Sequence, residues 1–86
     1  MNPHEEIEKT LDSLQQVRDE LILQAHLAKL EALKEWPGLE DKLKELRAKA
    51  DQVREVAEDE AMALVTAGKL LAEEIGKGYE RIRKLF

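Results

Sequence analysis

Two histidines and several neighbouring carboxylates are the side chains of this 86-residue sequence that are best suited to chemistry. A di-iron or di-manganese site in a helical bundle places a glutamate three residues before a histidine on each of two helices. His26 has Leu23 at that spacing, and His4 has no glutamate there either. The sequence therefore predicts no metal ligand.

Catalytic carboxylates and nucleophiles are not predicted either. The acidic runs at residues 58–60 and 73–74 lie in segments of helical periodicity. Adjacent side chains of a helix point about 100° apart and do not converge on one point. Ser13 is the only serine, and neither histidine has a spacing that makes it a base for this hydroxyl. We expect a non-enzymatic protein without a cofactor.

Composition and charge narrow the structural class of the protein and its possible partners. Apolar residues make up 43% and charged residues 38% of the chain, a mixture typical of long helices and coiled coils. There is no cysteine, which excludes disulfides and thiolate chemistry. The net charge of −5 opposes binding to a phosphate backbone, so no nucleic-acid partner is expected.

Targeting signals are not evident. The first residues, MNPHEEIEKT, contain no apolar core of a secretory signal. No apolar run approaches the roughly 18 residues that a membrane-spanning helix needs. We therefore expect a cytoplasmic protein that does not insert into a membrane.

Apolar residues recur at steps of three and four, the spacing of one helical face, along almost the whole chain. Asn2 is placed as an N-cap, with Pro3 at the first helical position. One apolar face runs over residues 7–32 and another over residues 39–86. These patterns predict an all-α protein, a single coiled-coil-like domain over residues 1–86.

The segment Trp36-Pro37-Gly38 decides the architecture. Proline and glycine both disfavour a helix interior, and Gly38 is an acceptable N-cap for a following helix. We predict a turn at residues 36–38 and an antiparallel helical hairpin with unequal arms, about 3–35 and 39–86. A kink in one long helix is the alternative, because the apolar spacing keeps its phase across the tryptophan.

A hairpin alone leaves apolar surface uncovered. Leu23, Leu27 and Leu30 form a second face of the first arm, and the end of the longer arm overhangs. Self-association, with a dimer favoured, is the simplest way to cover these two apolar surfaces. The alternative is a monomeric three-helix bundle, in which a break near Gly68 lets residues 69–86 fold back. The predicted interface residues are Leu23, Leu27, Leu30, Trp36, Leu64, Leu71, Ile75, Tyr79 and Ile82.

The function that follows is that of a helical scaffold or oligomerisation module. It would act through helix–helix contacts with its own copies or with another helical protein. The alternative is an amphipathic protein that binds a lipid or granule surface, as apolipoproteins and phasins do.

The stretches DELILQAHLAKLEALKEW and LLAEEIGKGYERIRKLF resemble those of small, uncharacterised coiled-coil proteins of proteobacteria. In similar sequences an acidic residue, rather than Pro37, tends to follow the tryptophan, which bears on the turn. The resemblance covers most of the chain. It implies a helical scaffold and a bacterial source, and it implies no activity and no site residue.

Overall fold

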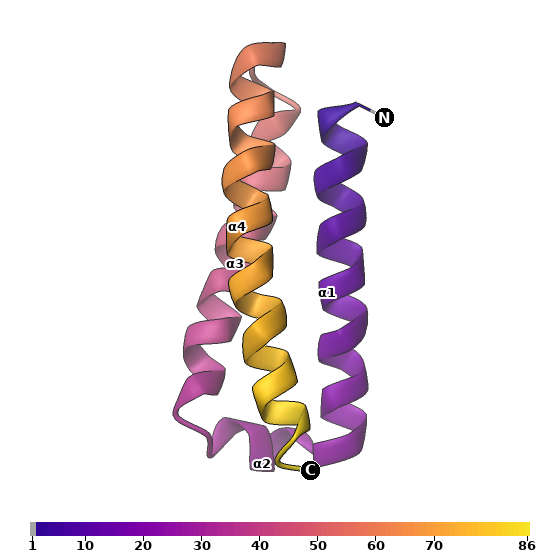
Figure 1. The fold of residues 1–86 in the computed structure, drawn as a ribbon, viewed down its shortest axis with the longest axis vertical. Helices are drawn as coiled ribbons and strands as arrows, with labels where there is room; N and C mark the ends of the chain where they lie inside the picture. Colours follow the sequence, from indigo (N-terminus) through magenta and orange to yellow (C-terminus); the bar gives the residue numbers. More distant parts are fainter. Residues whose placement is uncertain (1) are drawn as a thin grey trace.

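The computed structural model describes residues 2–86, which form helices and no strand. Three long helices lie side by side, each antiparallel to the long helix before it in the chain, and a short helix crosses one end of the bundle (Figure 1). The bundle is 42 Å along its longest axis. The all-α prediction is confirmed. The helices are α1 (Pro3–Ala25), α2 (Leu27–Glu31), α3 (Glu35–Val53) and α4 (Glu58–Arg83).

The prediction that residues 39–86 form one long helical arm is wrong, because the chain reverses its direction between α3 and α4. The Arg54 N–H bonds back to the carbonyl of Asp51, and Ala57 has an extended backbone (φ −64°, ψ 158°). This reversal contains neither glycine nor proline, so no strong breaker marked it. The four-residue steps Val53-Ala57-Ala61 kept the apolar spacing in phase and made the sequence read as continuous helix.

The alternative prediction of a three-helix bundle describes the chain path, but its break near Gly68 is wrong. Gly68 is buried inside α4, where a Cβ atom would lie 2.9 Å from Ile7 Cδ1. The glycine therefore serves close packing of α4 on α1. The segment that folds back is α4 as a whole, and not residues 69–86.

The turn that was predicted at residues 36–38 is found earlier in the chain, before Glu35. Trp36, Pro37 and Gly38 belong to the first turn of α3, so Gly38 is not its N-cap. Proline is tolerated there because the first N–H groups of a helix have no partner within it. The chain instead changes direction over residues 26–34, which contain α2 and the turn before Glu35.

His26 makes the sharp bend between α1 and α2. Its φ of 65° and ψ of 139° lie outside the regions that non-glycine residues favour. The His26 N–H still donates to the carbonyl of Ile22 at 2.9 Å, which closes the last turn of α1. The bend turns α2 across the end of the bundle, where Leu30 is fully buried.

The core fills the space between α1, α3 and α4. Each long helix contributes one apolar face at steps of three and four, as the periodicity predicted. Among the described residues, no charged side chain is buried, and Tyr79 is the buried residue that brings a polar atom, its hydroxyl, into the core. The largest fully buried side chains are Ile7, Leu21, Leu30, Leu46, Ile75, Tyr79 and Ile82.

Gly76 and Gly78 offer a matched test of helix packing, because both lie inside α4. A Cβ at Gly76 meets nothing within 4 Å, whereas one at Gly78 lies 2.9 Å from Leu39 Cδ1 and closer still to Cδ2. We expect Gly76→Ala to raise the free energy of unfolding by about 1 kcal/mol. Gly78→Ala should lower it by about 1–3 kcal/mol, because Leu39 is buried and must move. Urea denaturation followed by circular dichroism measures both, and equal stabilisation by both changes would contradict the close approach.

Candidate functional site

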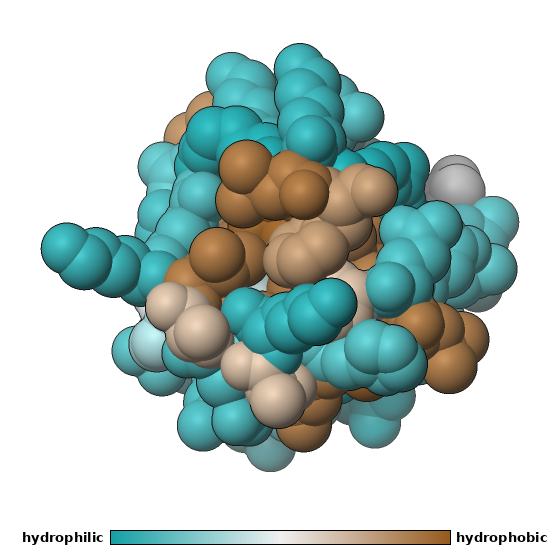
Figure 2. Space-filling model, turned by 90° about the horizontal axis from the view of Figure 1, so that it is seen from below, coloured by the Kyte–Doolittle hydropathy of each residue, from teal (hydrophilic) through white to brown (hydrophobic). Residues whose placement is uncertain are grey.

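The end of the bundle formed by α2 and the last residues of the chain exposes large apolar side chains. Leu23 is 79% exposed, Leu27 43%, Leu85 64% and Phe86 54%. Seen from this end, apolar residues gather across the middle of the molecule with hydrophilic residues around them (Figure 2). We call these four residues the apolar end.

Ion pairs fix the last turn of α4 beside the other helices at the apolar end. Arg81 pairs with Glu35 at the start of α3, and Arg83 Nη2 lies 3.7 Å from Glu20 Oε2 on α1. Each exposed pair contributes little stability. Together they link α4 to both neighbours, and the last residues of the chain lie at the end of the bundle that α2 crosses (Figure 1).

Lysines surround the apolar end. Lys29 lies on α2, Lys34 precedes α3, and Lys84 follows α4; all three are exposed. Within residues 2–86, none of the three ammonium groups lies within ion-pair distance of a carboxylate. Their charges are therefore available to a partner.

A part-buried ion pair with two aromatic rings joins the three long helices. Arg18 on α1 donates to both carboxylate oxygens of Glu40 on α3, at 2.7 and 2.9 Å. The hydrogen bond to Glu40 raises the pKa of Arg18. The guanidinium lies 5.9 Å from the centre of the Trp36 ring, which is 6.1 Å from the ring of Tyr79 on α4. This arrangement combines a bidentate pair with a cation–π contact.

The Tyr79 hydroxyl is buried and has no hydrogen-bond partner. Burial, and then the charge of Glu40, raise the pKa of Tyr79 to about 12. A phenol in this position favours its neutral form, because the phenolate would lose its hydration. The residue is thus a core aromatic that carries an unsatisfied polar atom.

The raised pKa of Tyr79 predicts loss of stability in alkali. The stability that comes from keeping the Tyr79 phenol neutral is fully present below its ordinary pKa of about 10. It is lost as the pH rises through the folded-state pKa of about 12. Tyr79 is the only tyrosine, so tyrosinate absorbance reports this group alone. We expect a midpoint near 12 in the folded protein and near 10 in urea.

Tyr79→Phe is the control for this titration. We expect a smaller alkaline loss of stability, and equal or greater stability at neutral pH, because the change removes a buried unpaired hydroxyl. A folded-state midpoint near 10 would contradict the burial of the hydroxyl.

The opposite end of the bundle is acidic. Residues 51–60 carry five acidic side chains and one arginine, and Glu5 lies nearby at the start of α1. We call Glu5, Glu55, Glu58, Asp59 and Glu60 the acidic end; all five are exposed. In the part of the chain that the structure describes, none of these carboxylates forms an ion pair.

A shallow depression of about 260 Å³ opens at the acidic end. The start of α1, the end of α3 and the start of α4 form its walls. Its lining combines four apolar residues with Asn2, His4 and the carboxylate of Glu58, so it offers apolar surface beside one negative charge. The lining residues are Asn2, Pro3, His4, Val53, Val56, Glu58 and Ala61.

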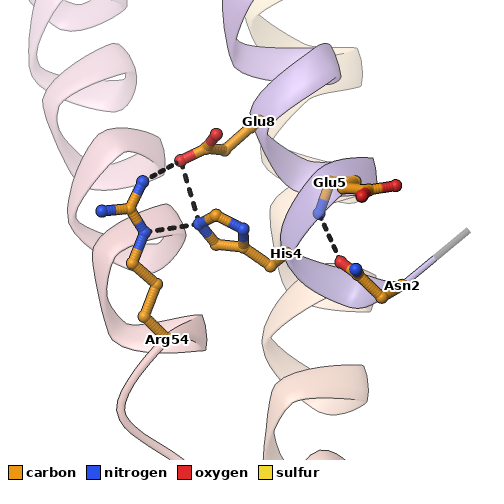
Figure 3. Close-up of polar contacts among 5 residues, drawn as sticks. All are labelled: Asn2, His4, Glu5, Glu8 and Arg54. Carbon is orange, nitrogen blue, oxygen red and sulfur yellow. Dashed lines mark hydrogen bonds and ion pairs between the residues drawn. The ribbon is translucent and has the colours of Figure 1, made fainter.

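Hydrogen bonds beside this depression hold α1 against the end of α3 (Figure 3). Arg54 donates to His4 Nε2 and to Glu8 Oε1, both at 2.5 Å, and His4 Nε2 lies 3.0 Å from the same Glu8 oxygen. The Arg54 hydrogen bond lowers the pKa of Glu8. The Asn2 side chain accepts from the Glu5 N–H at 2.8 Å, which confirms the predicted N-cap.

The predicted interface residues fall into two groups in one chain. Leu23 and Leu27 are exposed at the apolar end, as a contact surface requires. The others are covered within the chain, because the reversal before α4 folds that helix back over α1 and α3. The covered residues are Leu30, Trp36, Ile75, Tyr79 and Ile82, which are buried, and Leu64 and Leu71, which are partly buried.

Leu85 and Phe86 are not among the predicted interface residues, although the end of the longer arm was expected to need cover. Phe86 ended the predicted apolar face of the second arm, but nothing in the sequence showed that the core would stop at Ile82. Both lie beyond α4, whose last helical residue is Arg83.

Comparison with known proteins finds no matching family model, no matching curated protein and no matching solved structure. The resemblance to proteobacterial coiled-coil proteins therefore stays a prediction. Over residues 2–86, no three histidine or acidic side chains cluster closely enough to hold a metal ion. No helix in that range combines the length and the apolar character needed to cross a membrane.

Proposed function

We propose that this protein is a non-enzymatic helical module that associates with other protein chains, its own copies first, through the apolar end. The observation that carries the proposal is the exposure of Leu23, Leu27, Leu85 and Phe86 on one end of a well-packed bundle. Single exposed apolar residues are ordinary, whereas large exposed apolar patches mark interaction surfaces, and apolar residues gather at this end of the bundle (Figure 2). Removal of apolar area from water is the main favourable term in most protein–protein association.

The ionisable groups support a non-enzymatic role. Glu8 and Arg81, whose pKa values shift, are engaged in exposed ion pairs. Arg18 and Tyr79, the other two shifted groups, belong to the cluster that joins the helices. Structural ion pairs and burial account for these shifts, so they need no catalytic purpose.

Leu27→Glu tests the apolar end. Light scattering coupled to size-exclusion chromatography is run over a range of concentrations, and the wild-type mass should exceed 9.9 kDa as concentration rises. A carboxylate placed in the contact would have to be desolvated. We therefore expect Leu27→Glu to return the mass to that of the monomer with unchanged helicity.

Leu70→Glu is the matched control. Leu70 is 62% exposed in the middle of α4, away from both ends. This change should leave the mass at its wild-type value. Equal loss of association in both variants, or a wild-type mass that no change at the apolar end alters, would contradict the proposal.

A lipid surface is the second candidate, favoured by the lysines beside the apolar end. An apolar tip with Lys29, Lys34 and Lys84 around it would suit anionic lipid. Flotation with anionic vesicles is the test, and Leu27→Glu and Leu70→Glu serve again as variant and control. Flotation that Leu27→Glu abolishes would favour the membrane role, and no flotation would remove it.

A further inference from the structure

The two ends of the bundle carry opposite charge. Residues 77–86, at the apolar end, contain four basic side chains and one acidic side chain. Arg81 and Arg83 are paired with Glu35 and Glu20, and Lys77 and Lys84 are not in ion pairs among the described residues. Residues 51–60, at the acidic end, contain five acidic side chains and one basic side chain. The two segments lie at opposite ends of a 42 Å bundle (Figure 1), so they cannot meet within one copy.

The acidic end also offers apolar surface that an apolar side chain could cover. The depression there measures about 260 Å³ and has Val53, Val56 and Ala61 among its lining residues. An enclosed cavity of about 150 Å³ takes up benzene, whereas this depression is larger but open to solvent, so an aromatic side chain would lie against it without being enclosed. Phe86, the only phenylalanine, is 54% exposed beyond the end of α4.

We propose that Leu85 and Phe86 of one copy dock in the depression at the acidic end of a second copy, so that copies join head to tail. The inference rests on the proposed function and names both the partner and the surface it presents. Lys84, which is unpaired among the described residues, would then face Glu58 and its neighbours at the start of α4. Opposite charge would steer the two ends together and set their orientation.

Head-to-tail contact has a consequence for assembly. The two surfaces differ, so each bound copy still offers one free end of each kind. Such an interface does not close on itself and gives open chains unless the rotation happens to form a ring. We expect the mean mass to keep rising with concentration, and to fall in high salt because the charges are screened.

Two variants, each with one end blocked, test this arrangement. Phe86→Asp removes the aromatic side chain and adds a repelling charge, whereas Glu58→Lys places a cation in the depression. Each variant alone should stay at 9.9 kDa. Their equimolar mixture should form a complex of twice that mass, because one variant keeps its apolar end and the other keeps its depression.

Matched controls make the same chemical changes away from both ends. Leu70→Asp and Glu73→Lys alter exposed residues in the body of α4, and both should assemble like the wild type. Circular dichroism with thermal melting shows that each variant is folded before its mass is interpreted. The mixture is a second safeguard, because only folded variants can restore the complex.

The outcomes separate this inference from the proposed function. If Phe86→Asp is monomeric while Glu58→Lys assembles normally and the mixture forms no complex, the apolar ends join each other; the head-to-tail arrangement is then overturned and the proposed function stands. If neither variant changes the wild-type mass, the head-to-tail contact is overturned, and Leu27→Glu decides the proposed function separately. A wild-type protein that stays monomeric at all concentrations overturns the head-to-tail contact.

Discussion

The reversal at residues 54–57 is the constraint on which the rest of the structure depends. It returns α4 along the groove between α1 and α3. The three long helices then pack around one shared core, which α1 and α3 alone would leave partly uncovered. Most of the apolar residues of α4 are then covered within one chain. The acidic first turn, Glu58-Asp59-Glu60, lies where the positive end of the helix dipole favours it. Without the reversal, the same residues would form an exposed stripe that only a second chain could cover.

Close packing and one polar cluster then set how the three long helices meet. Gly68 and Gly78 leave room for Ile7 and Leu39, so α4 approaches both neighbours closely. Nearer the apolar end, the bidentate pair between Arg18 and Glu40 bridges α1 and α3, and the rings of Trp36 and Tyr79 continue the contact to α4. Packing of this kind fixes one arrangement, because a shift of any helix would break contacts on both others.

The two ends of the bundle differ in the charges that they carry. The charges at these ends follow from α4 itself, which starts with acidic residues and finishes with Arg81 and Arg83. That distribution stabilises the helix through its dipole, and it also leaves the bundle polar along its long axis. The exposed Leu85 and Phe86 lie at the positive end, and the depression lies at the negative end. A feature that stabilises one helix therefore also defines the surfaces available for association.

Local chemistry in the chain was enough to determine much of this protein. Apolar residues at steps of three and four require helices, and Asn2 and Pro3 require a helix start, because these effects act within one or two turns. Those signals give the all-α class and the face of each helix that is buried. They also predicted a second face of Leu23, Leu27 and Leu30, of which Leu23 and Leu27 are exposed, whereas Leu30 is buried after the bend into α2.

Tertiary contacts alone decided where the chain turns and which apolar residues remain on the surface. The bend at His26 has a backbone conformation that its residue type does not signal, and the reversal at residues 54–57 keeps the apolar phase. Each bend is followed four residues later by a residue that is buried in the shared core, Leu30 after His26 and Ala61 after Ala57. Leu85 and Phe86 are exposed because the core ends at Ile82, and that limit is set by the length of α1 and α3 rather than by any local pattern.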